Sequence, residues 1–332
     1  MKNNIMLTGI RSTGIPHLGN ILSVIIPSIK ISNNKKKINS SFIFIADLHS
    51  LIDDNKYIKE SIYQIMSTWL SFGLNINNCL FYRQSDISSE VTELAWYFSC
   101  IFPYKRLTLS HSFKERIYKN NEKINVGLFT YPILMAADIL LFDGSIIPIG
   151  KDQIQHIEIT RRIAKTFNKK INNKIFTIPN PLLQKKYSSI IGIDGKKMSK
   201  SKNNWINIFS PEKELKKKIM KIYTDNKSFN DKKNPKNNSI ISLYKLIAPL
   251  NKVEEMERKL RIGGYGYLEF KIELYKYIIK KFSSERNKFI YYMNNKKLLD
   301  NILFLGAKKA KIIAKKKLNS IRKHLNFNSL IL

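Results

Sequence analysis

The chain has 332 residues, of which 43% are hydrophobic and 25% are charged. This length allows two domains with buried cores, and the longest apolar run, ILSVIIPSI at residues 21–29, is short and contains a proline, which argues against a membrane span. The 58 Lys and Arg residues exceed the 25 Asp and Glu residues by 33. That excess favours a polyanionic partner such as nucleic acid, but only weakly, because lysine is frequent along the whole chain.

Two further features exclude whole classes of protein. The first residues, MKNNIMLTGIRSTG, lack the apolar stretch of a signal peptide, so we expect a cytoplasmic protein that is not bound to a membrane. The two cysteines, Cys79 and Cys100, match no metal-ligand spacing, so we expect no metal site built on cysteine.

The first half of the chain alternates strand-like and helix-like segments. Apolar runs rich in Ile and Phe predict buried parallel strands at residues 4–10, 41–48, 78–87 and 145–150. Helical periodicity predicts helices at residues 18–31, 57–72, 126–142 and 153–167. The predicted fold class is therefore α/β, with a Rossmann-like doubly wound parallel sheet. In such sheets the ligand site lies beyond the carboxyl ends of the strands, where the strand order reverses.

The second half of the chain reads as helical. Ser210, Pro211 and Glu212 predict a helix start, with a cap, a proline and an early acid in order. Helical periodicity follows at residues 241–260, 267–294 and 297–325. We therefore expect a C-terminal helical domain after the α/β half.

The turn after the first predicted strand, TGIRSTGIPHLGN at residues 8–20, is the first candidate site. A glycine-bearing turn between a strand and a helix is where helix N-terminal amides face an anion. The glycine spacing does not fit a dinucleotide fingerprint. Instead, His17 and Asn20 are three residues apart and share one face of the first helical turn, where both can hydrogen-bond a phosphate. An ordinary turn with a capping histidine explains the same residues.

A second candidate is the loop GIDGKKMSKSKNN at residues 192–204, which places four lysines beside two glycines. A basic loop of this kind is either a solvated surface or a phosphate-binding element. The choice between the two depends on what the rest of the chain offers.

Both candidates resemble one family. PHLGN resembles the His-x-Gly-His signature of class I aminoacyl-tRNA synthetases, and KMSKS at residues 197–201 is identical to the second signature of that class. The segment at residues 127–164 resembles tryptophanyl-tRNA synthetases, and the likeness extends over most of the chain. It includes IADLHSLI around His49, SFKER around Lys114, and GGYGYLEFK in the helical half. Tyrosyl-tRNA synthetases, the nearest relatives, usually carry glutamine where Met135 stands.

The chemistry of the substrate ring agrees with this resemblance. Met135 and Asp138 are three apart on a predicted helix and therefore project from the same face. An indole needs an apolar slot and one acceptor for its single N–H, which a methionine and a carboxylate supply. A carboxylate in the apolar helix PILMAADILL is costly without a dedicated partner, although a salt bridge or a cap is an alternative partner.

The resemblance implies an enzyme, a tryptophan–tRNA ligase. It would activate L-tryptophan with ATP to tryptophanyl-adenylate and pyrophosphate, and then transfer the tryptophanyl group to the 2′-hydroxyl of the 3′-terminal adenosine of tRNA(Trp). ATP would be accompanied by Mg²⁺, with no dedicated metal site in the protein, and a homodimer is expected. The implied domains are a catalytic domain at residues 1–204 and a helical anticodon-binding domain at residues 205–332, with its last helices able to pack back on the catalytic half.

The resemblance also implies a set of site residues. The catalytic residues would be His17, Asn20, Lys114, Lys197, Lys200 and Ser201. The ATP-binding residues would be Arg11, Ser12, Thr13, Gly19, Asn20, Gly150, Lys151, Asp152, Ile190, Lys197, Met198, Ser199, Lys200 and Ser201. The tryptophan-binding residues would be Gly9, His49, Tyr131, Met135, Asp138 and Gln153. His156 is interpreted as structural.

Three residues depart from the family pattern, and three alternative functions remain. Arg11 and Ser12 stand where the family commonly has glutamine and proline, and Lys151 stands where many members carry glutamate. The alternatives are a tyrosyl-tRNA synthetase, a non-catalytic RNA-binding relative, and a nucleotidylyltransferase of the same ancestry. The helical half argues against the last of these, and the intact signatures argue against a non-catalytic relative.

Overall fold

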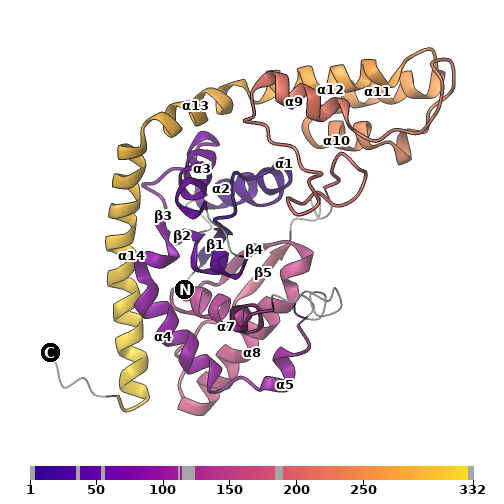
Figure 1. Ribbon diagram of the computed structural model, residues 1–332. Coiled ribbons are helices and arrows are strands. Elements are labelled where there is room, and N and C mark those ends of the chain that lie inside the picture. Colours follow the sequence, from indigo (N-terminus) through magenta and orange to yellow (C-terminus); the bar gives the residue numbers. More distant parts are fainter. Residues whose placement is uncertain are drawn as a thin grey trace.

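The computed structural model describes residues 4–34, 38–53, 57–110, 113, 124–183 and 190–327. Its centre is a parallel five-stranded sheet with the order β3-β2-β1-β4-β5 (Figure 1). The strands are β1 (Ile5–Arg11), β2 (Ser40–Ala46), β3 (Leu80–Arg83), β4 (Ile146–Ile149) and β5 (Asn180–Leu183). The predicted α/β fold class and doubly wound sheet are confirmed.

Alternate residues of each central strand enter two separate cores. On one face, Met6, Ile43 and Phe81 pack under the helices that follow β1 and β2. On the other face, Leu7 and Phe44 pack against the helices before and after β4. Successive side chains of a strand point to opposite faces, so continuous apolar runs are required when both faces are covered.

The helices of the first half form the two covering layers. They are α1 (Leu18–Asn20), a π-helical segment η1 (Ile21–Ile25), α2 (Ile26–Ser32), α3 (Ile58–Ser71), α4 (Ser88–Ser99), α5 (Tyr104–Leu107), α7 (Val126–Leu140) and α8 (Ile154–Ile171). Short 3₁₀ segments follow three strands: η2 (Leu48–Asp53), η3 (Gln84–Ile87) and η4 (Lys151–Gln153). These segments lie at the carboxyl edge of the sheet.

The second half is helical, as the sequence predicts. It comprises α9 (Glu212–Met220), η6 (Pro235–Asn237), α10 (Ser239–Ile247), α11 (Leu250–Ile262), α12 (Tyr267–Lys281), α13 (Ser283–Asn294) and α14 (Lys296–His324). Helices α9 to α12 form a group beyond the sheet, whereas α13 and α14 return along it (Figure 1). The long α14 contacts β3, α3 and α4. At its closest approach, a Cβ built on Gly306 would lie 1.9 Å from the Phe81 carbonyl oxygen, so only glycine allows this packing.

Several predicted boundaries in the first half are wrong. The strand predicted at residues 78–87 ends at Arg83, because the Arg83 N–H donates to Asp86 and turns the chain into η3. The strand predicted at residues 41–48 likewise ends at Ala46, before the 3₁₀ turn of η2. The helix predicted at residues 18–31 contains the π segment η1 just before Pro27, which has no N–H to donate.

Three predictions in the second half also need correction. Pro211, rather than Ser210, occupies the N-cap of α9 and makes no side-chain cap. The helix predicted at residues 241–260 is split into α10 and α11, because Pro249 forces Ala248 into an extended conformation. The helix predicted at residues 267–294 is divided at Phe282.

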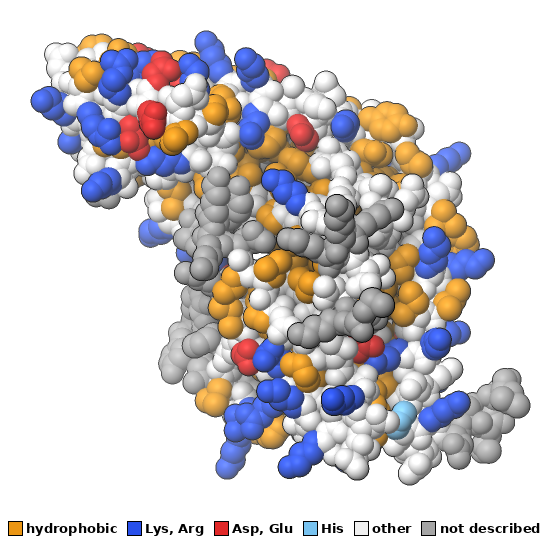
Figure 2. Space-filling view, turned by 180° about the vertical axis from the view of Figure 1, so that it is seen from behind, with side chains coloured by type: hydrophobic (Ala, Val, Ile, Leu, Met, Phe, Trp, Pro, Cys, Tyr) orange, Lys and Arg blue, Asp and Glu red, His pale blue; other side chains and the backbone are white. Residues whose placement is uncertain are grey.

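Lys and Arg side chains are scattered over the molecular face in Figure 2, over the helical group and the sheet half alike. This distribution agrees with a lysine bias that runs through the whole chain. Among the described helices, none combines the length and apolar character needed to cross a bilayer.

Candidate active site

Two of the three segments predicted to bind ATP, the turn of the first signature and residues 150–152, leave neighbouring strands. β1 and β4 are adjacent, and the strand order reverses between them, with β2 and β3 on one side and β5 on the other. The first loop begins after Arg11 at the end of β1, and the second begins at Gly150 after β4. A crevice outside the carboxyl ends of the strands at such a reversal is the ligand position in open α/β sheets.

His17 and Asn20 form a reciprocal cap at the start of α1. The Asn20 N–H donates to His17 Nδ1 at 3.1 Å, and the His17 N–H donates to Asn20 Oδ1 at 3.3 Å. Burial, helped by the charge of Lys200, lowers the pKa of His17 to about 4. The ring is therefore neutral near pH 7, and because Nδ1 accepts, its proton lies on Nε2, which remains available as a donor. The capping histidine of the alternative interpretation is confirmed, and it does not exclude a phosphate contact through Nε2.

The KMSKS loop is organised by Asn204, which is 2% exposed. The Asn204 side chain accepts from the Ser199 N–H at 2.8 Å and donates to Lys197 O at 3.0 Å and to Asp194 Oδ1 at 2.8 Å. A Cβ on Gly192 would lie 2.4 Å from the Asn204 carbonyl oxygen, so glycine is required where the two ends of the loop meet. This amide fixes the backbone on both sides of Met198.

Lys200 joins the KMSKS loop to the first candidate turn. Its Nζ donates to the Thr13 carbonyl oxygen at 2.9 Å and lies 5.8 Å from the centre of the Trp205 ring. A Cβ on Gly14 would stand 3.6 Å from the same Nζ. Burial, followed by the charge of Arg11, lowers the pKa of Lys200 to about 8. The two sequence signatures are therefore in direct contact.

The other polar groups of the loop are more exposed. Lys197 Nζ lies 3.3 Å from Asp152 Oδ1 of η4, and both side chains are more than half exposed. The hydroxyls of Ser199 and Ser201 are hydrogen-bonded to each other at 2.7 Å. The loop after β4 thus meets the KMSKS loop, and Asp152 also approaches Gly150 closely.

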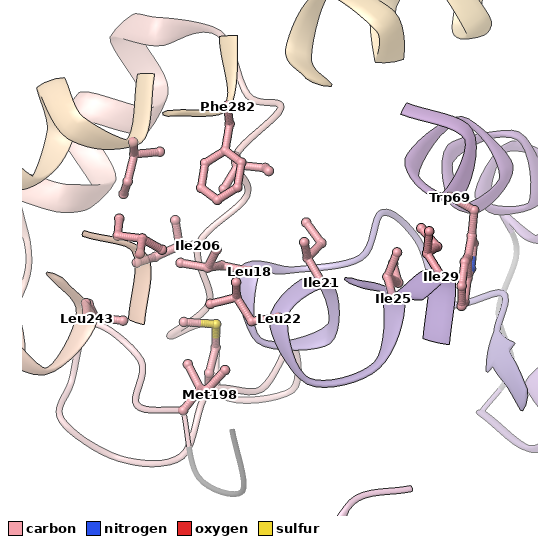
Figure 3. Packing of buried hydrophobic residues seen from close by; sticks show 14 of the residues in the cluster. Leu18, Ile21, Leu22, Ile25, Ile29, Trp69, Met198, Ile206, Leu243 and Phe282 are labelled. Atoms are coloured by element: carbon pink, nitrogen blue, oxygen red, sulfur yellow. The ribbon is translucent and has the colours of Figure 1, made fainter. Parts of the chain in front are cut away.

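Met198 anchors the loop to the first helix. Its side chain is 5% exposed and packs in one cluster with Leu18, Ile21 and Ile206 (Figure 3). Its N–H donates to the carbonyl oxygen of Ile190, which is also buried. The Leu18 N–H donates to the Ile206 carbonyl oxygen at 2.9 Å, so the start of α1 and the chain after the loop are tied together.

Asp138 of the predicted tryptophan site has two polar partners. His49 Nε2 lies 2.9 Å from Asp138 Oδ2, and Gln84 Nε2 donates to Oδ1 at 2.8 Å and to Oδ2 at 3.0 Å. Asp138, His49 and Gln84 are 2%, 7% and 0% exposed. Burial raises the pKa of Asp138, and the His49 and Gln84 donors oppose that rise. The carboxylate is therefore paired within the protein, as the alternative interpretation expects, and its contact with an indole N–H stays a prediction.

Tyr131 stands about two turns before Asp138 on α7. Its ring centre is 6.3 Å from that of His49, and its hydroxyl lies 2.7 Å from His156 Nε2. Met135 lies between the two on the same helix and is half-buried. The His156 contact agrees with the structural interpretation of that histidine.

The remaining predicted site residues that the structure describes make contacts outside the KMSKS loop and outside the Asp138 cluster. Gln153 is exposed, and the structure shows its backbone N–H bonded to Gly150 O. Gly9 lies beside Phe44, whose ring leaves no space for a Cβ. Arg11 pairs with Asp53 at 2.7 Å, and buried Ser12 hydrogen-bonds Ser50. Lys114 and the side chain of Lys151 lie outside the described part of the chain.

Sequence reasoning missed Gln84 and Asn204. Gln84 falls within a predicted strand, and Asn204 is the last residue of the candidate loop and has no predicted role. The available signal was a polar residue soon after a strand or a signature. The partners of Gln84 lie 35 and 54 residues away in the sequence, whereas those of Asn204 lie within ten residues.

Comparison with known proteins agrees with this geometry. Residues 1–283 match the family described as tRNA synthetases class I (W and Y). A tryptophan–tRNA ligase from Fusobacterium nucleatum is 38% identical over 318 residues, which cover 95% of this chain and 96% of the relative.

Two solved structures have the same architecture. A tryptophanyl-tRNA synthetase from Campylobacter jejuni, complexed with ADP and tryptophan, superposes with a TM-score of 0.87 at 37% identity and covers 97% of this chain and 99% of its own. The enzyme from Mycoplasma pneumoniae gives a TM-score of 0.81 at 27% identity, with 98% of both chains covered. Because residues 1–283 match this family and the Fusobacterium relative is 38% identical over 95% of the chain, the chain belongs to the class I tRNA synthetases for tryptophan and tyrosine.

Proposed function

We infer that the chain is a tryptophan–tRNA ligase that uses ATP to activate L-tryptophan and charges tRNA(Trp). The observation that carries this inference is the contact between Lys200 Nζ and Thr13 O, which brings the KMSKS loop onto the turn of the first signature. The buried acceptor Asp138 lies in the same half of the molecule and suits the indole N–H.

In the first step, a tryptophan carboxylate oxygen bonds to the α-phosphorus of ATP. The bond from that phosphorus to the bridging oxygen of the β-phosphate breaks, and pyrophosphate leaves with the electron pair. The attacking carboxylate is already ionised at neutral pH, so the site needs no general base. Catalysis then consists of aligning the reactants and stabilising phosphate charge.

We assign the phosphate contacts to the two signatures. Lys197 and Lys200 would neutralise the charge of the leaving pyrophosphate, and Ser199 and Ser201 would donate hydrogen bonds. Neutral His17 would donate from Nε2. The other proposed ATP contacts are Arg11, Ser12, Thr13, Gly19, Asn20, Gly150, Lys151, Asp152, Ile190 and Met198, and Lys114 is a further proposed catalytic residue.

We propose that Mg²⁺ enters with the ATP. The described residues contain no group of three or more His, Cys, Asp or Glu side chains able to hold a metal ion. Magnesium in ATP sites is held largely by phosphate oxygens and water, with one or two carboxylates, and when bound it would offset phosphate charge. The exposed carboxylate of Asp152, beside Lys197, is suited to such a contact.

Asp138 would accept the indole N–H, with Met135 and His49 bordering the ring. Tyr131 and Gln153 would contact the ammonium and carboxylate groups, and Gly9 would allow close approach. A fixed acceptor in an apolar site disfavours smaller side chains, because they leave its remaining acceptor position unfilled.

In the second step, the tryptophanyl group moves to the 2′-hydroxyl of the terminal adenosine, and AMP leaves. We propose that residues 1–204 form the catalytic domain and residues 205–332 bind the anticodon. We also propose a cytoplasmic homodimer. Leu51, Tyr104 and Val126 are exposed apolar side chains of the catalytic half.

Pyrophosphate exchange into ATP tests the proposal. The purified protein should exchange with tryptophan and not with tyrosine or other amino acids, and it should then charge tRNA(Trp). Exchange with tyrosine alone would retain the mechanism and overturn the assignment of Asp138 and Met135. An absence of exchange with every amino acid, in a folded protein, would contradict the ligase function.

A further inference from the structure

Gln84 is a buried residue whose polar contacts converge on the proposed indole acceptor. It is the first residue after β3 and is 0% exposed. Its amide nitrogen donates to both oxygens of Asp138, and its amide oxygen accepts from the His49 N–H at 3.4 Å. One side chain thus links the segments that carry His49 and Asp138.

We propose that Gln84 is a positioning residue that makes Asp138 an ionised, fixed, acceptor-only group and thereby sets the preference for tryptophan over tyrosine. The proposal rests on the function inferred above. It concerns a residue that makes no proposed contact with the substrate and acts through Asp138.

The first argument concerns charge. A buried carboxylate favours its neutral, protonated form unless hydrogen-bond donors stabilise the anion. Gln84 supplies two such contacts and His49 a third, all at 3.0 Å or less. The neighbouring Asp47 acts in the opposite direction, because its charge raises the pKa of Asp138. The Gln84 amide is neutral, so it stabilises the anion without adding a second charge to the pocket.

The second argument concerns selectivity. The indole N–H is only a donor, whereas a phenol hydroxyl both donates and accepts. The Gln84 amide nitrogen and His49 Nε2 are both directed at Asp138, so the donors next to this carboxylate are already engaged. A tyrosine hydroxyl could donate to Asp138, but these groups would offer its oxygen no donor in return. An unmatched polar atom in a buried site lowers affinity strongly.

The ionisable groups that face Asp138 define what a pH profile would report. They are Asp47 at the end of β2, His49 on η2 and Tyr82 on β3, whose own pKa is raised by burial and by the charge of Asp138. Donors to a carboxylate lower its pKa, so removing the Gln84 amide raises the pKa of Asp138 further. The acidic limb of kcat/KM for tryptophan should therefore move to higher pH.

Two substitutions test the proposal by pyrophosphate exchange. In Gln84→Met, which keeps the size and removes the donors, KM for tryptophan should rise about tenfold, with KM for ATP within about twofold of the parent. The acidic limb of kcat/KM for tryptophan should move to higher pH, and the ratio of the exchange activity with tryptophan to that with tyrosine should fall. In Gln84→Glu, the two neighbouring carboxyl groups share one proton, so activity near neutral pH should be largely retained and a new loss should appear at alkaline pH.

The matched control is Gln155→Met, which removes an amide donor from the Leu109 carbonyl oxygen on another part of the catalytic half. It should change neither KM for tryptophan nor the pH profile. The proposal is overturned if Gln84→Met keeps the parent KM and acidic limb, or if it lowers kcat and thermal stability with no selective change for tryptophan. If Gln84→Met does not fold, the alkaline loss in Gln84→Glu decides. A parent protein without tryptophan exchange would instead refute the proposed function itself.

Discussion

Lys200 has a pKa of about 8 because it is buried near another cation, and its ammonium group is held by the Thr13 carbonyl oxygen. A lysine in this state is charged at neutral pH but loses its proton more readily than an exposed lysine. Asn204, near the end of the same loop, has a different role. Its side chain is uncharged and fixes the backbone of the loop through three hydrogen bonds. The charge and the shape of the loop therefore depend on different residues.

Replacing Lys200 should separate chemistry from substrate binding. Lys200→Ala should lower the rate of adenylate formation at least a hundredfold and leave tryptophan binding within about threefold of the parent, because the proposed role of this charge is to stabilise the leaving group. In the parent, kcat/KM for ATP should decline as pH rises above about 8, since deprotonation removes that charge. In Lys200→Arg this decline should vanish from the measured range. A Lys200→Ala enzyme with turnover within a few-fold of the parent would contradict the leaving-group role.

Replacing Asn204 should deform the loop without touching the lysines. Asn204→Ala should lower kcat for pyrophosphate exchange by roughly ten- to a hundredfold, because the Ser199 N–H and the Lys197 carbonyl oxygen lose their buried partner. Tryptophan binding, measured by equilibrium titration, should not change. The neighbouring Asn203→Gly is the control, since Asn203 is exposed and has a positive φ that glycine adopts freely. Equal losses in both variants would remove Asn204 from this role.

At the scale of helices and strands, the sequence predicts what periodicity and apolar runs encode. β1, β2 and β4 follow from Ile and Phe runs that are buried on both faces. The sequence does not predict β5, because this strand has only four residues, NPLL, and they are partly exposed. Helix α4 has a periodic pattern that the predicted elements do not include. Its residues Val91, Leu94 and Phe98 lie on one buried face.

The candidate site was predictable to a similar extent. The signature motifs identify the phosphate-facing loops, and the Met135–Asp138 spacing identifies one face of α7. The partners of Asp138 were not predictable, because Gln84 and His49 reach it from segments 54 and 89 residues away. The π segment η1 also has no periodicity of its own in this sequence. Contacts between distant segments depend on the completed fold.

The close approach of Gly306 to the backbone of β3 gives a testable prediction about the packing of α14. Gly306→Ala should destabilise the protein by about 2–4 kcal/mol, even though alanine favours helices, because its Cβ would overlap the Phe81 carbonyl oxygen and push α14 off β3. Denaturant unfolding measures this change. Lys309→Ala, at an exposed position three residues further along α14, should stay within about 0.5 kcal/mol of the parent. A neutral Gly306→Ala would mean that α14 does not need this close approach.

For the molecule as a whole, positive charges exceed negative ones by 33, and on the face in Figure 2 the Lys and Arg side chains are spread out rather than gathered in one patch. Such a distribution attracts RNA over long distances but gives no sequence information. The positive charge should therefore govern how fast tRNA associates more than which tRNA is selected.

A salt titration checks this interpretation. Raising monovalent salt from about 50 to 200 mM should weaken tRNA binding by at least a hundredfold, whereas KM for tryptophan should change little. Lys308→Ala and Lys315→Ala, both at exposed positions of α14, should each weaken tRNA binding less than about threefold. A tenfold loss from either single substitution would indicate a specific contact instead of a diffuse field.

The return of α14 to the edge strand β3 also has a consequence for biosynthesis. During translation, Leu80–Arg83 leaves the ribosome long before Lys296–His324, which later covers it. At an elongation rate of about 5–20 residues per second, the interval is roughly 10–40 s. Throughout that time the nascent chain presents an uncovered strand edge and the apolar surface that will contact Ala310 and Ala314. The growing polypeptide should therefore be a client of ribosome-associated chaperones until α14 has been synthesised.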